Sequence, residues 1–322
     1  MQTQEIAFVV NDDGYTDGSL LVPRFPLRTS HDLREINIAY RIHGDRSKPL
    51  IIALGGISAH RGLTAEAAGK KAWWPEIVGP GQGINTEQFC VLSFDYLGGS
   101  ADTSGPLQSH WPEAARISTE DQAQLAHHLL ENLGFSHVHH WVGASYGGMV
   151  GLAYAKLYPK KLRKLTVISA AHRSHPMAMA WRYIQREIVA LGLATGETKR
   201  SLAIARALAM TTYRSPEEFG ERFSELADVV SYLEACGSRY AESTSELAFS
   251  CLSASIDDHL IDLKGLTVDL EIIGFWEDRL VPAEILKELA DITGGDLKLF
   301  HSVYGHDAFL KETSLFTELL SS

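Results

Sequence analysis

The chain has 322 residues, 45% of them hydrophobic and 21% charged, which is typical of a globular protein with one large domain or a core carrying an insertion. Asp and Glu (40) outnumber Lys and Arg (29), and the net charge of −11 argues against broad binding to nucleic acid or anionic membranes. Three widely spaced cysteines without a CxxC pair predict neither a metal site nor a disulfide framework. We find no signal-peptide pattern and no apolar stretch of membrane-spanning length, so we expect a cytoplasmic protein.

Predicted strands and helices alternate in the first half of the chain. Short apolar runs predict strands, at residues 36–42, 50–54, 89–94, 140–143 and 165–169. Apolar residues at helical spacing, closed by Gly134 and Pro159, predict two helices, over residues 119–133 and 147–158. This alternation is typical of a mostly parallel sheet flanked by helices.

The pattern changes in the second half of the chain. Helical stretches dominate between residues 171 and 263, and the clearest of them cover 177–191, 201–212 and 216–228. A strand, a helix and a strand then follow, at 266–273, 283–292 and 297–303. We therefore predict an α/β core formed by residues 1–170 and 264–322, interrupted by a helical cap formed by residues 171–263.

A G-x-S-x-G pentapeptide at residues 143–147 stands between the predicted strand at 140–143 and the predicted helix at 147–158. Small residues on both sides of Ser145 permit a sharp strand-to-helix turn that exposes its hydroxyl. This context predicts that Ser145 is a catalytic nucleophile.

A serine nucleophile needs a base and an acid that orients the base. Asp278 follows a late strand, with Glu277 as the adjacent alternative, and His306 follows the last strand, with His301 as the alternative. The chain order Ser145, Asp278, His306 is the order of the α/β-hydrolase fold, which we predict here.

Two backbone N–H groups are expected to stabilise the oxyanion of the tetrahedral intermediate. One is that of Tyr146, directly after the nucleophile. The other belongs to the loop after the strand at residues 50–54, where we expect Leu54, with Gly55 next in line.

Several longer motifs resemble the homoserine O-acyltransferase family, which includes homoserine O-acetyltransferases and their succinyl-using relatives. The resemblance extends from about residue 36 to 310 and rests on five segments, at residues 73–81 (WWPEIVGPG), 97–106 (LGGSADTSGP), 147–149 (GGM), 203–223 (AIARALAMTTYRSPEEFGERF) and 305–310 (GHDAFL). The chain departs from the family in its short cap, in Tyr146, where methionine is usual, and in Asp95-Tyr96, which replace an asparagine.

The resemblance implies a substrate class. Arg186 matches the family arginine expected to hold the carboxylate of homoserine, and Asp307 matches the aspartate expected to meet its ammonium group. It implies an acyl-CoA co-substrate (acetyl-CoA or succinyl-CoA), a ping-pong reaction through acyl-serine, a place in methionine biosynthesis, no bound cofactor, and a homodimer formed through the cap helices. The alternative is a serine esterase or thioesterase that uses the same triad with water.

Overall fold

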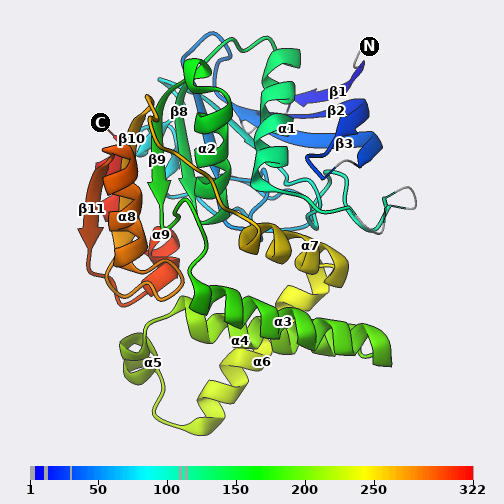
Figure 1. Ribbon diagram of the computed structural model, residues 1–322, viewed down its shortest axis with the longest axis vertical. Helices are drawn as coiled ribbons and strands as arrows, with labels where there is room; N and C mark the ends of the chain where they lie inside the picture. The colour runs from blue at the N-terminus through cyan, green and yellow to red at the C-terminus, as the bar shows by residue number, and fades with distance from the viewer. Residues whose placement is uncertain (1–3, 11–13, 30, 109–110, 113–114, 322) are drawn as a thin grey trace.

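The computed structural model describes residues 4–10, 14–29, 31–108, 111–112 and 115–321 (Figure 1). Its described part contains a central sheet of nine strands and, apart from it, the short pair β5 (Val78–Gly79) and β6 (Ile84–Asn85). The order across the central sheet is β1 (Gln4–Val10), β2 (Tyr15–Pro26), β3 (Asp32–His43), β7 (Cys90–Phe94), β4 (Leu50–Leu54), β8 (Val138–Ala144), β9 (Leu162–Ile168), β10 (Asp269–Phe275) and β11 (Asp296–Phe300).

The sheet is mostly parallel, as predicted. The six strands from β7 to β11 run parallel to their neighbours, whereas β1, β2 and β3 form an antiparallel extension. All five residues of β4 are buried, which explains why this strand reads as a continuous apolar run. The carboxyl ends of the parallel strands face the same side of the molecule, where the cap lies (Figure 1).

Helices cover both faces of the sheet. On one face α1 (Thr119–Asn132), α2 (Tyr146–Leu157) and α8 (Ala283–Thr293) pack against the strands (Figure 1). On the other face α10 (Thr313–Leu320) and the long segment after β4 enclose a second apolar core, which includes Trp74, Ile77, Val142, Phe275 and Phe316. Two cores, one on each face, are the expected consequence of a doubly covered parallel sheet.

Five helices lie between β9 and β10 in the chain and form the cap. They are α3 (Pro176–Thr195), α4 (Thr198–Tyr213), α5 (Pro216–Arg222), α6 (Leu226–Ser243) and α7 (Glu246–Asp257). In Figure 1 they lie below the carboxyl ends of the strands, and α7 is the cap helix nearest to the sheet. The cap has a small core of its own, made by Val189, Leu202, Ala205, Ala241 and Phe249.

The prediction of a single helix over residues 216–228 was wrong. The chain forms two helices there, because α5 ends before Phe223, whose backbone is extended (φ −126°, ψ 123°), and α6 begins at Leu226. The ring of Phe223 packs 5.2 Å from that of Tyr232 on α6. This contact between the residue that follows α5 and the helix α6 is a tertiary effect that helical periodicity does not reveal.

Two strand boundaries also differ from the prediction. β10 begins at Asp269 rather than residue 266, because the Leu266 N–H closes a turn on the Leu263 carbonyl. β11 ends at Phe300 rather than residue 303, because the Ser302 N–H turns toward the Glu277 carboxylate, 2.8 Å away.

The described residues contain no helix long and apolar enough to cross a lipid bilayer. They also contain no group of three or more histidine, cysteine or acidic side chains placed to hold a metal ion. Cys90, Cys236 and Cys251 are all unpaired.

Candidate active site

Ser145 stands in a strained turn between β8 and α2. Its φ of 52° lies in the left-handed region, which non-glycine residues rarely adopt. The flanking glycines are required by space, because a Cβ on Gly143 would lie 2.3 Å from the Gly147 carbonyl oxygen and one on Gly147 would lie 2.4 Å from the Leu54 carbonyl oxygen. The G-x-S-x-G pattern therefore reflects a close crossing of β4, β8 and α2.

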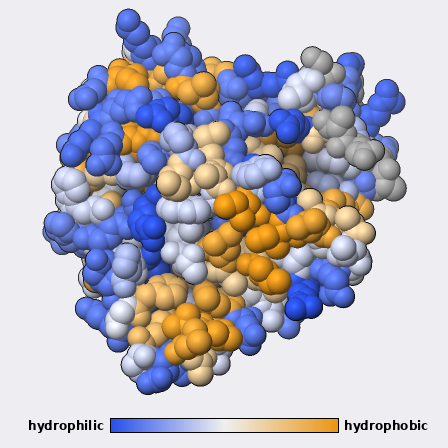
Figure 2. All heavy atoms as spheres, turned by 60° about the horizontal axis from the view of Figure 1, so that its bottom comes forward, coloured by the Kyte–Doolittle hydropathy of each residue, from blue (hydrophilic) through white to orange (hydrophobic). Residues whose placement is uncertain are grey.

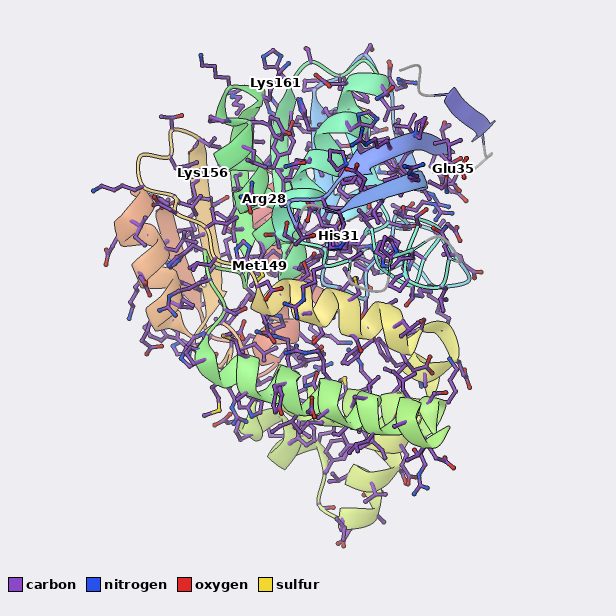
Figure 3. The ribbon with its side chains drawn as sticks, turned by 45° about the vertical axis from the view of Figure 1, so that its right-hand side comes forward. Arg28, His31, Glu35, Met149, Lys156 and Lys161 are labelled. Atoms are coloured by element: carbon purple, nitrogen blue, oxygen red, sulfur yellow. The ribbon has the colours of Figure 1, made fainter. Side chains whose placement is uncertain are left out.

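The turn directs Ser145 toward the cap. Met149, in the first turn of α2, lies at the end of that helix next to the cap, whereas Lys161 lies beyond the opposite end (Figure 3). An added Cβ on Gly56 would lie 3.9 Å from Ser145 Oγ, so the loop after β4 passes directly beside the hydroxyl.

Ser145, His306 and Asp278 form one hydrogen-bonded row. His306 Nε2 lies 2.9 Å from Ser145 Oγ, and His306 Nδ1 lies 2.8 Å from Asp278 Oδ2. The second carboxylate oxygen of Asp278 accepts hydrogen bonds from the N–H groups of Leu280 (2.9 Å) and Val281 (3.0 Å). With Asp278 ionised, the Nδ1–H donates to it and Nε2 is free to accept the Ser145 proton.

The surroundings of His306 favour its protonated form. Burial lowers the pKa of this imidazole, but the Asp278 carboxylate, by its charge and its hydrogen bond, and the charge of Asp307 raise it, while Arg182 lowers it. The net result is a pKa above the ordinary value of 6.5. A base of this kind is stabilised when it takes up the nucleophile's proton.

The alternative acid and base pair with each other. His301 Nδ1 lies 2.8 Å from Glu277 Oε1, and Glu277 also accepts the hydrogen bond from the Ser302 N–H. The side chain of His301 is 79% exposed, whereas that of His306 is 8% exposed. The structure therefore joins Asp278 and His306, not Glu277 and His301, to Ser145.

The two expected oxyanion donors lie on either side of the β4–α2 crossing. Leu54 ends β4, and Tyr146 is the first residue of α2, where a backbone N–H has no carbonyl of its own helix to bind. The loop after Leu54 is fixed at Gly55, whose carbonyl accepts hydrogen bonds from the Gly147 N–H (2.9 Å) and the Tyr96 hydroxyl (2.6 Å). Their role as oxyanion donors stays a prediction.

Tyr96 and Tyr146, two positions at which the chain departs from the family pattern, contact each other. The ring of Tyr96 meets that of Tyr146 edge-on, with centroids 4.9 Å apart. The Tyr146 hydroxyl lies 2.6 Å from Ser255 Oγ on α7. Tyr146 thus links the elbow to the cap, and Tyr96 links it to the loop after β4. The sequence marked both positions as unusual but gave no sign of these links.

Ser145 and His306 open into a cavity of about 950 Å³ between the sheet edge and the cap. Three lysines and six arginines line it, against two acids, Glu242 and Asp307, in the described part of the chain. Four of these arginines pair with carboxylates, Arg173 with Glu288, Arg182 with Asp257, Arg214 with Asp307 and Arg222 with Glu218. The remaining lysines and arginines of the wall still outnumber its acids, so the cavity favours anionic groups. Such a volume also exceeds what one small amino acid fills.

The structure separates the two predicted substrate-binding residues. Asp307 lines the cavity next to His306, and its Oδ2 lies 3.1 Å from Arg214 Nε. Arg186 is not part of the cavity wall, and its Nη1 donates to Asp257 Oδ2 (2.6 Å) and Ser253 Oγ (2.9 Å). Arg182, one helical turn earlier on α3, lines the cavity instead. Sequence reasoning missed Arg182, although the spacing of two arginines four residues apart places both on one side of a helix.

Known proteins share this architecture. Residues 49–312 match the family model described as "alpha/beta hydrolase fold". A homoserine O-succinyltransferase of Xanthomonas campestris is 38% identical over 314 residues, which cover 94% of this chain and 82% of that protein.

Solved structures of other proteins superpose on this chain. A homoserine O-acetyltransferase of Staphylococcus aureus superposes with a TM-score of 0.84 at 25% identity, covering 95% of this chain and 94% of that one. Esterase E22 superposes with a TM-score of 0.85 at 16% identity, covering 95% and 99%, and this likeness shows the fold alone. The chain is therefore a member of the homoserine O-acyltransferase family of the α/β-hydrolase superfamily.

Proposed function

We propose that this protein is an acyl-CoA-dependent O-acyltransferase that acts on L-homoserine and serves methionine biosynthesis in the cytoplasm. The observation that carries the proposal is the hydrogen-bonded row of Ser145, His306 and Asp278 at the base of a cationic cavity under the cap. Membership of the homoserine O-acyltransferase family supports the reaction class.

The reaction proceeds in two steps. In the first, His306 Nε2 takes the hydroxyl proton while Ser145 Oγ attacks the thioester carbonyl of the acyl-CoA. The N–H groups of Leu54 and Tyr146 bind the oxyanion. The C–S bond breaks, CoA leaves as a thiol with the proton from His306, and the acyl group remains as an ester on Ser145.

In the second step the acceptor takes the place of CoA. His306 removes the proton of the homoserine hydroxyl, whose oxygen attacks the acyl-serine carbonyl. The Ser145–acyl bond then breaks, Ser145 recovers its proton from His306, and O-acylhomoserine leaves. Asp278 holds the imidazole and stabilises its charged form in both steps.

Charges at the cavity wall favour these substrates. The phosphates of CoA are anionic and suit the lysines and arginines that line the cavity. The Asp307 carboxylate, beside His306, provides a partner for the ammonium group of the acceptor. CoA enters here as a co-substrate, and the mechanism requires no resident cofactor.

Transfer must compete with hydrolysis, because an esterase or thioesterase uses the same triad with water. Transfer wins only if the acceptor hydroxyl is held in place and water is kept scarce. The test is a donor–acceptor matrix that crosses acetyl-CoA and succinyl-CoA with homoserine, serine and water. The proposal expects ester formation on homoserine to exceed release of free acid, and the reverse result would assign the protein to the hydrolases.

We further propose that the chain forms a homodimer through the cap. Figure 2 shows apolar side chains gathered on the face that carries the cap helices. On α3 alone the exposed large hydrophobic residues are Met177, Met179, Tyr183, Ile184, Leu191 and Leu193. Exposed apolar surface of this kind marks association sites. Sedimentation equilibrium should give twice the chain mass, and a monomer at micromolar concentration would contradict the dimer.

A further inference from the structure

The loop after β4 is held at both ends by two consecutive residues that follow β7. We call residues 54–61 the oxyanion loop, because it carries the second expected oxyanion donor. Near its start, the Gly55 carbonyl accepts a hydrogen bond from the Tyr96 hydroxyl (2.6 Å). At its end, the Arg61 N–H donates to Asp95 Oδ1 (2.7 Å). Asp95 and Tyr96 directly follow β7, so the end of one strand anchors both ends of the loop.

The oxyanion loop forms the cavity wall beside the nucleophile. Residues 56–60 all line the cavity into which Ser145 and His306 open. An added Cβ on Gly56 would lie 3.8 Å from Ser145 Cβ, so the loop backbone passes within contact distance of the serine. Donors for an oxyanion act through a fixed geometry that suits the tetrahedral intermediate. A displacement of this loop would therefore slow the first chemical step.

Arg61 and Asp95 form a buried ion pair where the loop ends. Their side chains are 11% and 0% exposed. Arg61 Nη1 pairs with Asp95 Oδ2, which also accepts the hydrogen bond of the Asp102 N–H (3.1 Å). With the Arg61 N–H, the Asp95 carboxylate receives three donors. Arg61 Nη2 in turn pairs with the Asp102 carboxylate (2.7 Å), so the guanidinium links the loop to both acids.

These contacts give a reason for one departure from the family pattern, which has an asparagine where this chain has Asp95-Tyr96. An asparagine side chain has a single acceptor oxygen, and its NH₂ group would face an N–H donor on the other side. It would also remove one of the carboxylates that balance the charge of the Arg61 guanidinium. The carboxylate of Asp95 and the guanidinium of Arg61 therefore require each other.

We propose that Arg61 and Asp95 are positioning residues that hold the oxyanion loop in the geometry required for acylation of Ser145. Neither side chain lines the cavity, so both act through the backbone of the loop rather than on the substrate. The inference rests on the proposed acyl chemistry of Ser145. It concerns the donor step, which precedes the reaction with any acceptor.

The test follows acylation of Ser145 by p-nitrophenyl acetate, per active site, in the wild type, Asp95→Asn, Arg61→Gln and Arg61→Lys. Asp95→Asn and Arg61→Gln should lower the maximal acylation rate about 10- to 100-fold and change KM less than about twofold, because the oxyanion forms only on the way to the tetrahedral intermediate. Arg61→Lys should recover part of the rate, because it keeps the charge. The double variant Asp95→Asn/Arg61→Gln should be no slower than the slower single variant, since the pair acts as one unit.

A second readout separates positioning from a loss of stability. 1,1,1-Trifluoroacetone accepts Ser145 Oγ at its carbonyl carbon while the hydroxyl proton passes to His306, and the resulting hemiketal oxyanion needs the same donors. Its inhibition constant should rise by the same factor as the acylation rate falls. Glu271→Gln is the control, because Glu271 is also a buried acid with a basic partner, Lys298 Nζ at 2.6 Å. This variant should acylate at the wild-type rate even where it unfolds at a lower temperature.

Three results would overturn the inference. The first is a wild-type acylation rate in the folded variants at positions 61 and 95. The second is a raised KM with unchanged inhibition by trifluoroacetone, and the third is an equal loss in Glu271→Gln. Where a single variant does not fold, Arg61→Lys and the double variant decide the question by the same two readouts. A wild type that forms no acyl-enzyme would instead refute the proposed function, so the two failures are distinguishable.

Discussion

Replacing Asp278 by asparagine tests the triad with an almost isosteric change. The asparagine oxygen can still accept from the N–H groups of Leu280 and Val281, which hold Oδ1 at 2.9 and 3.0 Å, so the loop should keep its shape. The amide NH₂ then faces His306 Nδ1, where a carboxylate oxygen stood 2.8 Å away. An NH₂ donor makes Nδ1 the acceptor and puts the imidazole proton on Nε2. In that tautomer Nε2 cannot take the Ser145 proton.

The expected loss follows from this tautomer change. A histidine held in the wrong tautomer lowers kcat by roughly 10⁴-fold in Ser-His-Asp triads. Glu277→Gln is the matched control, because Glu277 is the neighbouring carboxylate and also holds a histidine, His301, at 2.8 Å. The His301 side chain of that pair is 79% exposed, and ion pairs with an exposed partner contribute about 1 kcal/mol or less, so the control should lose less than about fivefold.

The assay is the burst of p-nitrophenol released when Ser145 is acylated by p-nitrophenyl acetate, with thermal unfolding of each variant as the folding check. We expect Asp278→Asn to abolish the burst and Glu277→Gln to retain it. If both variants are folded and Glu277→Gln loses more activity than Asp278→Asn, the assignment of the acid is refuted.

Three further predictions concern the same site. Ser145→Ala should fold normally and lose several thousand-fold or more in transfer, and an acyl adduct on this variant by intact mass would rule out Ser145 as nucleophile. Because the pKa of His306 is raised above 6.5 and the base must be neutral, acylation should fall as pH drops through a midpoint above 6.5; a midpoint below 6.5 would contradict the structure. Tyr96→Phe should slow acylation about fivefold at unchanged donor KM, since it removes one hydrogen bond of about 1 kcal/mol from the loop after β4. Tyr154→Phe, another buried tyrosine, is its control and should acylate at the wild-type rate.

The core of the fold could be read from the sequence because its signals are local. The predicted strand at residues 50–54 coincides with β4, which is buried along its whole length and therefore apolar throughout. The pentapeptide around Ser145 is equally local, since its glycines are required by contacts within a few ångströms. Ser145, Asp278 and His306 each follow the carboxyl end of a strand, in that order along the chain. The parallel sheet then brings these strand ends together.

The cap was harder to predict because its details depend on contacts between helices. At the break between α5 and α6, Phe223 packs against Tyr232, a contact that periodicity in one helix does not encode. Likewise, the places of Arg182 and Arg186 depend on how α3 is rotated against α7, because both side chains donate to Asp257. A motif match selected Arg186, but only the three-dimensional arrangement shows that Arg182 lines the cavity and Arg186 does not.

The central claim is that the acyl group on Ser145 is transferred to homoserine rather than to water. The most direct measurement is the partitioning of the preformed acyl-enzyme, isolated after reaction with acetyl-CoA or succinyl-CoA and mixed with increasing homoserine. The account predicts that homoserine accelerates the loss of the acyl mass from the protein and that O-acylhomoserine accounts for most of the product. Loss at a rate independent of homoserine, with free acid as the product, would contradict it.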